Sequence, residues 1–235
     1  MPLEDKPKIR SFIKASSWFE EIPTALLDVL AEQATFIALG SNAYVWSIAE
    51  QTTSVYGVFS GRVRTAIASA QGQEFAIKDC EAGAWLGAPC LVNDGGRVIE
   101  AKTLVASELV VISRHVMLAL AQQWPTLYRN LFRHNAEESR GLYVLLTGMA
   151  FYPLRARVAG RLMQLVNESG TAVEGGMLLS PKPSQIDFAQ LAVGSRQRVN
   201  KIFREWDKSG LIKYSDDRLL IRDVAALERE IMPFD

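Results

Sequence analysis

The side chains best suited to chemistry in this sequence lie close together near its C-terminus. Arg196, Gln197 and Lys201 recur at a spacing that would place them on one side of a helix. Arginine and lysine can donate to guanine O6 and N7, and a glutamine or asparagine amide can pair with adenine N6 and N7. We therefore expect these three residues to read base edges in the major groove of DNA, with Asn200 beside them.

Positive charge is concentrated around these side chains. Between Ser195 and Lys213 there are six lysine or arginine residues and two acidic residues, which gives the segment a net charge of +4. Such cations neutralise phosphates and supply much of the sequence-independent affinity for DNA. The residues expected to contact phosphates are Ser184, Gln185, Ser195 and Arg198. An ordinary helix with a solvated basic face is the alternative explanation of the charge pattern.

Two short helices joined by a turn would position these residues. Ser184 can cap the first helix, and Gly194 ends it. Ser195 can cap a second helix, which we expect to run through Lys208 and to stop at Gly210. The predicted buried faces are Phe188, Leu191 and Ala192 in the first helix and Val199, Ile202, Phe203 and Trp206 in the second.

A small hairpin is expected after the second helix. Apolar runs at residues 211–214 and 219–221 flank the polar segment 215–218, a pattern typical of two short strands and a turn. In helix-turn-helix proteins the second helix reads bases with its N-terminal residues. The two helices and the hairpin together favour a winged helix-turn-helix over a solvated basic helix.

A family resemblance is carried by residues 194–212, which read GSRQRVNKIFREWDKSGLI. This segment resembles the winged helix-turn-helix of the Crp/Fnr family of bacterial transcription regulators, and a weaker resemblance extends over nearly all of the chain. The family usually has its turn glycine one or two residues before the position of Gly194. It also usually has an acid at the position of Gln197, so the resemblance implies an operator different from that of the cyclic-AMP receptor protein.

The composition is that of a globular protein with local rather than general basic character. The chain has 235 residues, 49% of them apolar, which is enough for two domains with cores. Its formal net charge is zero. Since we find neither a signal peptide nor an apolar run of about 20 residues, we expect a cytoplasmic protein without a membrane partner.

Short apolar runs separated by turn residues extend from Thr35 to Ser113, which is typical of an antiparallel barrel or sandwich. Helices are expected before them, within residues 8–34. The expected strands are residues 35–39, 43–48, 54–59, 62–68, 74–77, 97–101, 103–106 and 108–112. The region resembles the cyclic-nucleotide-binding β-roll of the same family.

The resemblance allows the family's nucleotide site to be compared with this chain. Residues 83–89, with Gly87 among them, correspond to the phosphate-binding turn, and Arg97 corresponds to an arginine that pairs with phosphate. Ala88 stands where nucleotide-binding members have an acid that accepts from the ribose hydroxyl, and Val98 replaces a hydroxyl donor. The turn therefore lacks several of the groups that hold a cyclic nucleotide.

Leu142 and Tyr143 stand at the two helix positions that would reach the nucleotide base, again without small hydroxyl groups. Hydrogen bonds that involve charged groups contribute about 1–3 kcal/mol each, so we expect that cyclic AMP is not a tight ligand and that no cofactor is needed. The candidate residues for another effector are Arg97, Gly87, Ala88 and Tyr143. The alternative for Arg97 is a solvated loop arginine.

The remaining reactive side chains give weaker signals. His115 and His134 are the only histidines, and since no Cys–His set has metal-ligand spacing we expect structural roles. Cys80 and Cys90 could form a redox pair, but buried inert thiols fit a cytoplasmic protein better. Trp85 could line an apolar effector pocket, although such a residue more often belongs to the core.

A long helix is expected from Pro125 to about Phe151, after a short helix at residues 114–124. Positions that step by four and three, as in a helix–helix seam, are Leu127, Leu131, His134, Glu138, Gly141 or Leu142, Leu145, and Gly148 or Met149. The resemblance favours a homodimer formed through this helix. The alternative is a helix packed on its own β-roll.

Pro153 separates the long helix from the next one, which we expect at residues 155–168. In that helix Arg155, Arg157 and Arg161 either contact phosphates or are solvated. We expect a loop or short strand pair at residues 169–183 and a terminal helix at residues 223–230.

The sequence thus predicts an α+β protein. Residues 1–124 would form the β-roll with flanking helices, residues 125–153 the dimerisation helix and hinge, and residues 154–235 the winged helix-turn-helix domain. The expected function is transcription regulation by a homodimer that binds a palindrome in double-stranded DNA, with recognition helices about 34 Å apart. RNA polymerase is a candidate partner.

The alternative is a small-molecule-sensing module or an enzyme whose C-terminal domain mediates protein contacts. We find no G-x-S-x-G, H-E-x-x-H or P-loop motif, and an enzyme is not expected.

Overall fold

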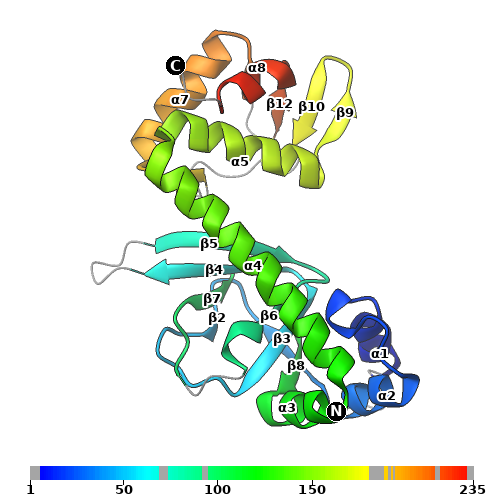
Figure 1. The fold of residues 1–235 in the computed structure, drawn as a ribbon. Coiled ribbons are helices and arrows are strands. Elements are labelled where there is room, and N and C mark those ends of the chain that lie inside the picture. Colours follow the sequence, from blue (N-terminus) through cyan, green and yellow to red (C-terminus); the bar gives the residue numbers. More distant parts are fainter. Residues whose placement is uncertain are drawn as a thin grey trace. The chain divides into compact units, whose positions relative to one another are not determined.

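The protein is described by a computed structural model, which covers residues 6–68, 74–91, 95–179, 188–189, 192, 194–214 and 218–231. The chain divides into two compact units, Met1–Gly141 and Leu142–Asp235. The long helix α4 (Pro125–Phe151) contributes residues to both units (Figure 1). Within the described ranges, no helix combines the length and apolarity needed to cross a membrane.

The first unit is built around two antiparallel four-stranded sheets, with strand orders β1-β8-β3-β6 and β2-β7-β4-β5 (Figure 1). Its strands are β1 (Thr35–Leu39), β2 (Tyr44–Trp46), β3 (Ser54–Ser60), β4 (Arg62–Ala68), β5 (Glu74–Glu81), β6 (Trp85–Leu86), β7 (Glu100–Thr103) and β8 (Ser107–Ser113). The antiparallel β-strand architecture expected from the spacing of apolar runs is confirmed.

Two of the predicted strands are wrong. Residues 97–101 and 103–106 were expected as separate strands, but the structure has the single strand β7. Arg97 lies outside the ladder because its N–H donates to the carbonyl of Glu50 and its carbonyl accepts from Ala49. The chain turns after Thr103, whose hydroxyl donates to the carbonyl of Gly40. Strand β6, inside the segment expected as a turn, pairs with β3 and was not predicted.

Helices cover the first unit and share its core. They are α1 (Lys6–Lys14), the 3-10 helix η2 (Ser17–Phe19), α2 (Thr24–Gln33), the 3-10 helix η3 (Ala88–Cys90) and α3 (Arg114–Gln123). Trp85 belongs to this core, since its ring centroid lies 5.6 Å from that of Trp18 and 5.0 Å from that of Phe19. The interpretation of Trp85 as a core residue is therefore confirmed.

The first half of α4 packs on its own unit. Leu127, Asn130 and Leu131 are buried, and the Asn130 amide donates to the carbonyls of Trp18 and Glu20. Farther along, Glu138 pairs with Lys78 of β5 at 2.7 Å. The seam predicted for a dimer is therefore wrong at Leu127, Leu131 and His134, which pack inside their own unit. Its later positions, among them the exposed Leu142 and Met149, stay a prediction.

The second unit combines helices with a four-stranded sheet of order β11-β12-β10-β9. Its elements are α5 (Leu154–Ser169), β9 (Thr171–Val173), β10 (Gly176–Leu179), α7 (Arg196–Lys208), β11 (Ile212–Tyr214), β12 (Leu219–Ile221) and α8 (Val224–Arg229). The predicted hairpin at 211–221 and the strand pair at 169–183 are both present, and β12 joins them through β10 (Figure 1).

Leu154, in the first turn of α5, lies against the backbone that precedes α7. A Cβ atom at Gly194 would be 2.5 Å from Leu154 Cδ1 and 2.9 Å from its Cδ2. Leu154 is itself buried in the core of the unit, so it has little room to move away. Gly194 therefore serves close packing between α5 and the start of α7.

We expect Gly194→Ala to destabilise the protein by about 1–3 kcal/mol, because the new methyl group overpacks the contact with Leu154. Chemical denaturation would measure this change in the free energy of unfolding. The control is the Gly194→Ala/Leu154→Ala double variant, in which the second truncation makes room for the first. Its loss of stability should be smaller than the sum of the two single losses, and simple additivity would show that the contact does not exist.

Candidate nucleic-acid interface

Helix α7 divides its side chains cleanly between core and solvent. Val199, Phe203 and Trp206 are buried, and Ile202 is nearly so. The predicted base-reading and phosphate-contacting residues lie on the other side of the helix. Arg196, Gln197, Arg198 and Lys201 are exposed there, and Asn200 is half-buried. The structure therefore brings these residues together on the N-terminal half of one helix.

The N-terminus of α7 is capped as expected. Ser195 has extended backbone angles, and its Oγ accepts from the N–H of Arg198 at 3.4 Å. The other N–H groups of this first turn point out of the helix end, where the helix dipole is positive, so the end favours a phosphate. Ser195 keeps its hydroxyl proton for a phosphate contact, which remains a prediction.

Both acidic residues of α7 are engaged within the second unit. Glu205 accepts from Nη1 of Arg155 at 2.6 Å, and Asp207 Oδ1 accepts from the N–H of Tyr214 at 3.2 Å. The outward basic side chains thus dominate the charge of the N-terminal half of the helix. This arrangement suits a polyanionic partner.

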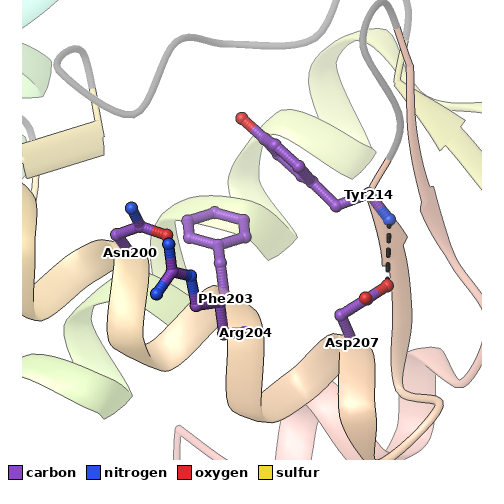
Figure 2. Close-up of a pocket in the computed structure, with 5 residues that line it drawn as sticks. All are labelled: Asn200, Phe203, Arg204, Asp207 and Tyr214. Atoms are coloured by element: carbon purple, nitrogen blue, oxygen red, sulfur yellow. Dashed lines mark hydrogen bonds between the residues drawn. The ribbon is translucent and has the colours of Figure 1, made fainter.

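A cavity of about 270 Å³ lies between α7 and β11, lined by Asn200, Phe203, Arg204, Asp207 and Tyr214 (Figure 2). The rings of Phe203 and Tyr214 pack with centroids 5.4 Å apart, and the bond from Tyr214 to Asp207 closes one side. These contacts fix the first strand of the hairpin against the second helix.

The first helix of the predicted pair falls largely outside the described residues. Ser184, Gln185 and Leu191 lie there, and their predicted roles stay predictions. Phe188 and Ala192 are buried, as expected, and the Ala192 N–H donates to the Phe188 carbonyl at 2.9 Å.

Arg155 takes neither of the two roles expected for it. Its Nε and Nη2 donate to the two carboxylate oxygens of Glu230 at 2.5 and 2.9 Å, and its Nη1 donates to Glu205. Its guanidinium carbon lies 5.3 Å from the centre of a Trp206 ring. The prediction of a phosphate contact or a solvated side chain is therefore wrong for Arg155, because two carboxylates of its own domain hold it.

Sequence reasoning missed this cluster, although one signal was present. Arg155 precedes the buried residues Val158 and Ala159 by three and four positions, so it lies on the apolar side of α5. A charged residue on such a stripe requires a partner. The identity of that partner could not be read locally, since Glu230 is 75 residues away in the sequence.

Arg157 is half-buried, and its pKa is lowered by burial and, secondarily, by the charge of Arg198. Two guanidinium groups therefore influence each other at the N-terminal side of α7. Arg161 donates to Gln164 of the same helix. A phosphate contact from Arg157 remains a prediction.

In the first unit, the environment of Arg97 differs from the solvated loop expected as an alternative. Arg97 is only 3% exposed, its Nη2 donates to the Ser54 carbonyl at 2.6 Å, and its guanidinium stacks 4.2 Å from the Trp46 ring centre. Gly87 has φ of +99°, and a Cβ there would lie 2.8 Å from Arg97 Nη1. Arg97 and Gly87 are thus together, with the guanidinium already engaged.

The other residues compared with the family's nucleotide site differ in exposure. Ala88 is buried, whereas Val98 is 74% exposed. Leu142 and Tyr143 are exposed on α4 and belong to the second unit. The role of Tyr143 in an effector site remains a prediction.

His134 and the described cysteine have structural environments. His134 packs on Trp18 with ring centroids 5.0 Å apart, and burial lowers its pKa; His115 is exposed on α3. Cys80 is a buried free thiol whose pKa burial raises to about 12. Among the described residues, no three or more histidine, cysteine, aspartate or glutamate side chains cluster in a way that could hold a metal ion.

The Arg155–Glu230 pair makes the second unit sensitive to acid. The hydrogen bond from Arg155 lowers the pKa of Glu230 below its ordinary value of 4.5. The charged Glu230 carboxylate therefore stabilises the folded state at pH values above its ordinary pKa. This stabilisation is lost as the pH falls through the lower pKa that Glu230 has in the folded state.

We expect the free energy of unfolding of the wild type to fall more steeply below about pH 5 than that of Glu230→Gln. Denaturant titrations between neutral pH and about pH 3 would measure both. Glu228→Gln, at an exposed position of α8, is the matched control and should follow the wild type. Parallel curves for Glu230→Gln and the wild type would contradict the assignment.

Two sequence families match this chain. A cyclic nucleotide-binding domain matches residues 11–123, and a Crp-like helix-turn-helix domain matches residues 156–230. The CRP-like cAMP-activated global transcriptional regulator of Mycobacterium tuberculosis is 24% identical over 211 residues, which cover 90% of this chain and 94% of that protein. The two domain matches together account for most of the sequence.

Solved structures share the fold. A mutant of CooA from Carboxydothermus hydrogenoformans gives a TM-score of 0.75 at 19% identity, covering 91% of this chain and 92% of its own. The c-di-GMP responsive global regulator CLP of Xanthomonas campestris gives a TM-score of 0.75 at 16% identity, covering 86% of this chain and 100% of its own. With both of its domains matched in the expected order, the chain belongs to the Crp/Fnr family of transcription regulators and carries a helix-turn-helix DNA-binding domain.

Proposed function

We propose that this protein is a homodimeric, cytoplasmic regulator that reads a near-palindromic operator through the major groove and that RNA polymerase is its further partner. The observation that carries the proposal is the outward face of α7, where four exposed or half-buried donors follow the capped helix start: Arg196, Gln197, Asn200 and Lys201. A recognition helix reads bases with these N-terminal positions.

The chemistry of these side chains also limits the sequence they read. Arg196 and Lys201 suit guanine, and the Gln197 amide suits adenine, whereas an acid at that position would accept from cytosine. The operator should therefore differ from one read by a relative with an acid at this position. Arg198, with Ser195, would hold phosphates and set the register of the helix in the groove.

Arg196→Ala should weaken binding to an operator selected from random duplexes by about 1–3 kcal/mol and relax the preference at one base pair of each half-site. Fluorescence anisotropy at fixed salt, with the selected operator and single-base variants of it, would measure both effects. Lys208→Ala removes the same charge at the far end of α7, and it should retain the base preference. An Arg196→Ala protein that keeps the full preference would exclude this residue as a base reader.

The proposed dimer contact is the exposed apolar face of α4. This face keeps the predicted seam positions Leu142 and Met149, but in the first half of the helix it is shifted by one residue, because Leu127 and Leu131 point into their own unit while Tyr128 and Phe132 point outward. The exposed apolar residues on this side of the helix are Tyr128, Phe132, Leu142, Tyr143, Leu146 and Met149. Steps of four, from Tyr128 to Phe132 and from Leu142 to Leu146, and a step of three from Leu146 to Met149 place them on one side of the helix, which suits a helix–helix contact. A second copy is the occupant that would bring two recognition helices to one duplex.

Leu146→Asp should convert the dimer into a monomer, because it places a charge inside the proposed apolar contact. Light scattering coupled to size-exclusion chromatography would give the mass. Val144→Asp is the matched control: Val144 is 73% exposed against 57% for Leu146, but it projects from another side of the same helix. A dimer of unchanged stability in Leu146→Asp would refute this interface.

The proposed sensor domain does not bind cyclic AMP tightly. Arg97, which would meet a phosphate, already donates to Ser54 and stacks on Trp46, and Ala88 offers no acceptor to a ribose hydroxyl. Relatives of this fold are named for different effectors, cAMP in Mycobacterium tuberculosis and c-di-GMP in Xanthomonas campestris. The fold is therefore compatible with an effector other than cyclic AMP.

Isothermal titration of the full chain with cyclic AMP should show no binding at micromolar concentrations, because the lost hydrogen bonds are worth about 1–3 kcal/mol each. The cAMP-activated relative from Mycobacterium tuberculosis, titrated in the same buffer, serves as the positive control. A micromolar dissociation constant for the present protein would overturn this part of the proposal.

A further inference from the structure

We infer that Arg155 is a positioning residue for the recognition helix α7: it fixes the orientation of α7 from within the domain and does not contact the DNA backbone. The inference rests on the proposed function, because orientation of α7 matters only if α7 reads DNA. It assigns a DNA-recognition role to a residue that lies on a different helix from the base readers.

The guanidinium of Arg155 connects three helices of the second unit. From α5 it donates twice to Glu230, just beyond the last residue of α8, and once to Glu205 on α7. It also lies against the ring of Trp206, which is completely buried. A planar guanidinium can donate to both carboxylates and lie against the ring at the same time, whereas a lysine ammonium cannot make the same bidentate contact.

The residue before Arg155 contacts the opposite end of α7. Leu154 packs against Gly194, next to the N-cap, while Arg155 holds Glu205 and Trp206 eleven or twelve positions later. At 1.5 Å per residue these two contacts are about 16 Å apart along the helix. Two contacts this far apart, both from the first turn of α5, fix the tilt of α7 better than either contact alone.

The charge of Arg155 is already balanced inside the domain. Two carboxylates accept from it, and the hydrogen bond that it donates to Glu230 is the largest cause of the rise in its pKa. A phosphate would have to compete with both carboxylates. Arg198, by contrast, is an exposed arginine at the start of α7 and has the position expected for a phosphate contact.

The experiment compares the specificity of DNA binding with its salt dependence. Arg155→Met, Glu205→Gln, the double variant and Arg198→Ala are each titrated with the selected operator and with an unrelated duplex of equal length over a series of salt concentrations. The specificity ratio is the affinity for the operator divided by that for the unrelated duplex. Thermal unfolding of every variant reports on the fold.

For Arg155→Met we expect the specificity ratio to fall about tenfold, as when a charge-assisted hydrogen bond is lost. The slope of log affinity against log salt should not change, because no phosphate contact is removed. Glu205→Gln should also lower the ratio, although it removes a negative charge that repels DNA. The double variant should be no worse than Arg155→Met, since both residues act through one contact.

A phosphate contact would give a different result and would overturn the inference. Arg155→Met would then weaken binding to both duplexes equally and reduce the salt slope by about one, the behaviour that we expect of Arg198→Ala. A variant that is less heat-stable but keeps its specificity ratio would reduce Arg155 to a role in stability and would also overturn the inference.

Two further results keep the test decisive. If Arg155→Met fails to fold, Glu205→Gln carries the test, because it leaves the pair between Arg155 and Glu230 in place and Glu205 is 47% exposed. If the wild type selects no symmetric duplex at all, the proposed function fails. If it does select one and Glu205→Gln keeps the full ratio, only the inference about Arg155 fails.

Discussion

Burial of one stripe of α7 is the constraint on which the rest of the DNA-binding unit depends. Val199, Phe203 and Trp206 are in the core, and burying each such side chain fully is worth about 1.5–3 kcal/mol. Because a helix is rigid, holding these three residues inside leaves the side chains on the other face outside. The polar face that would meet DNA is therefore fixed by apolar packing, and the cap at Ser195 fixes where it begins.

Two arginines show how strongly tertiary contacts decide what a charged residue can do. Arg97 and Arg155 both stood at positions where a phosphate contact was considered, and both are engaged by their own unit. The Arg97 guanidinium donates to a carbonyl and stacks on an aromatic ring, and the Arg155 guanidinium donates to two carboxylates. In each case the partner lies more than forty residues away in the sequence. A guanidinium in a sequence thus indicates an anionic or polar partner but not where that partner is.

The long helix α4 has two faces with different surroundings. Its first half is held on its own unit by Leu127, by the Asn130 amide and by the pair between Glu138 and Lys78. Its other side exposes large apolar residues such as Phe132 and Leu146. The seam predicted from the sequence combined positions of both faces, since Leu127 and Leu131 belong to the internal core whereas Leu142 and Met149 are exposed. Spacing alone could not distinguish the two faces, because apolar residues recur in steps of three and four on both, and such steps fit any helix–helix contact.

The sequence by itself indicated the family through the resemblance of residues 194–212, and it determined most helices and the polarity of α7, because periodicity, capping and turn residues act over a few positions. It also located strands such as β1 and β4 to the residue. Only the tertiary structure decided the single strand β7, the buried state of Arg97, the partners of Arg155 and the free face of α4. These features arise from contacts between residues far apart in the chain, and such contacts depend on packing in three dimensions that no local pattern records.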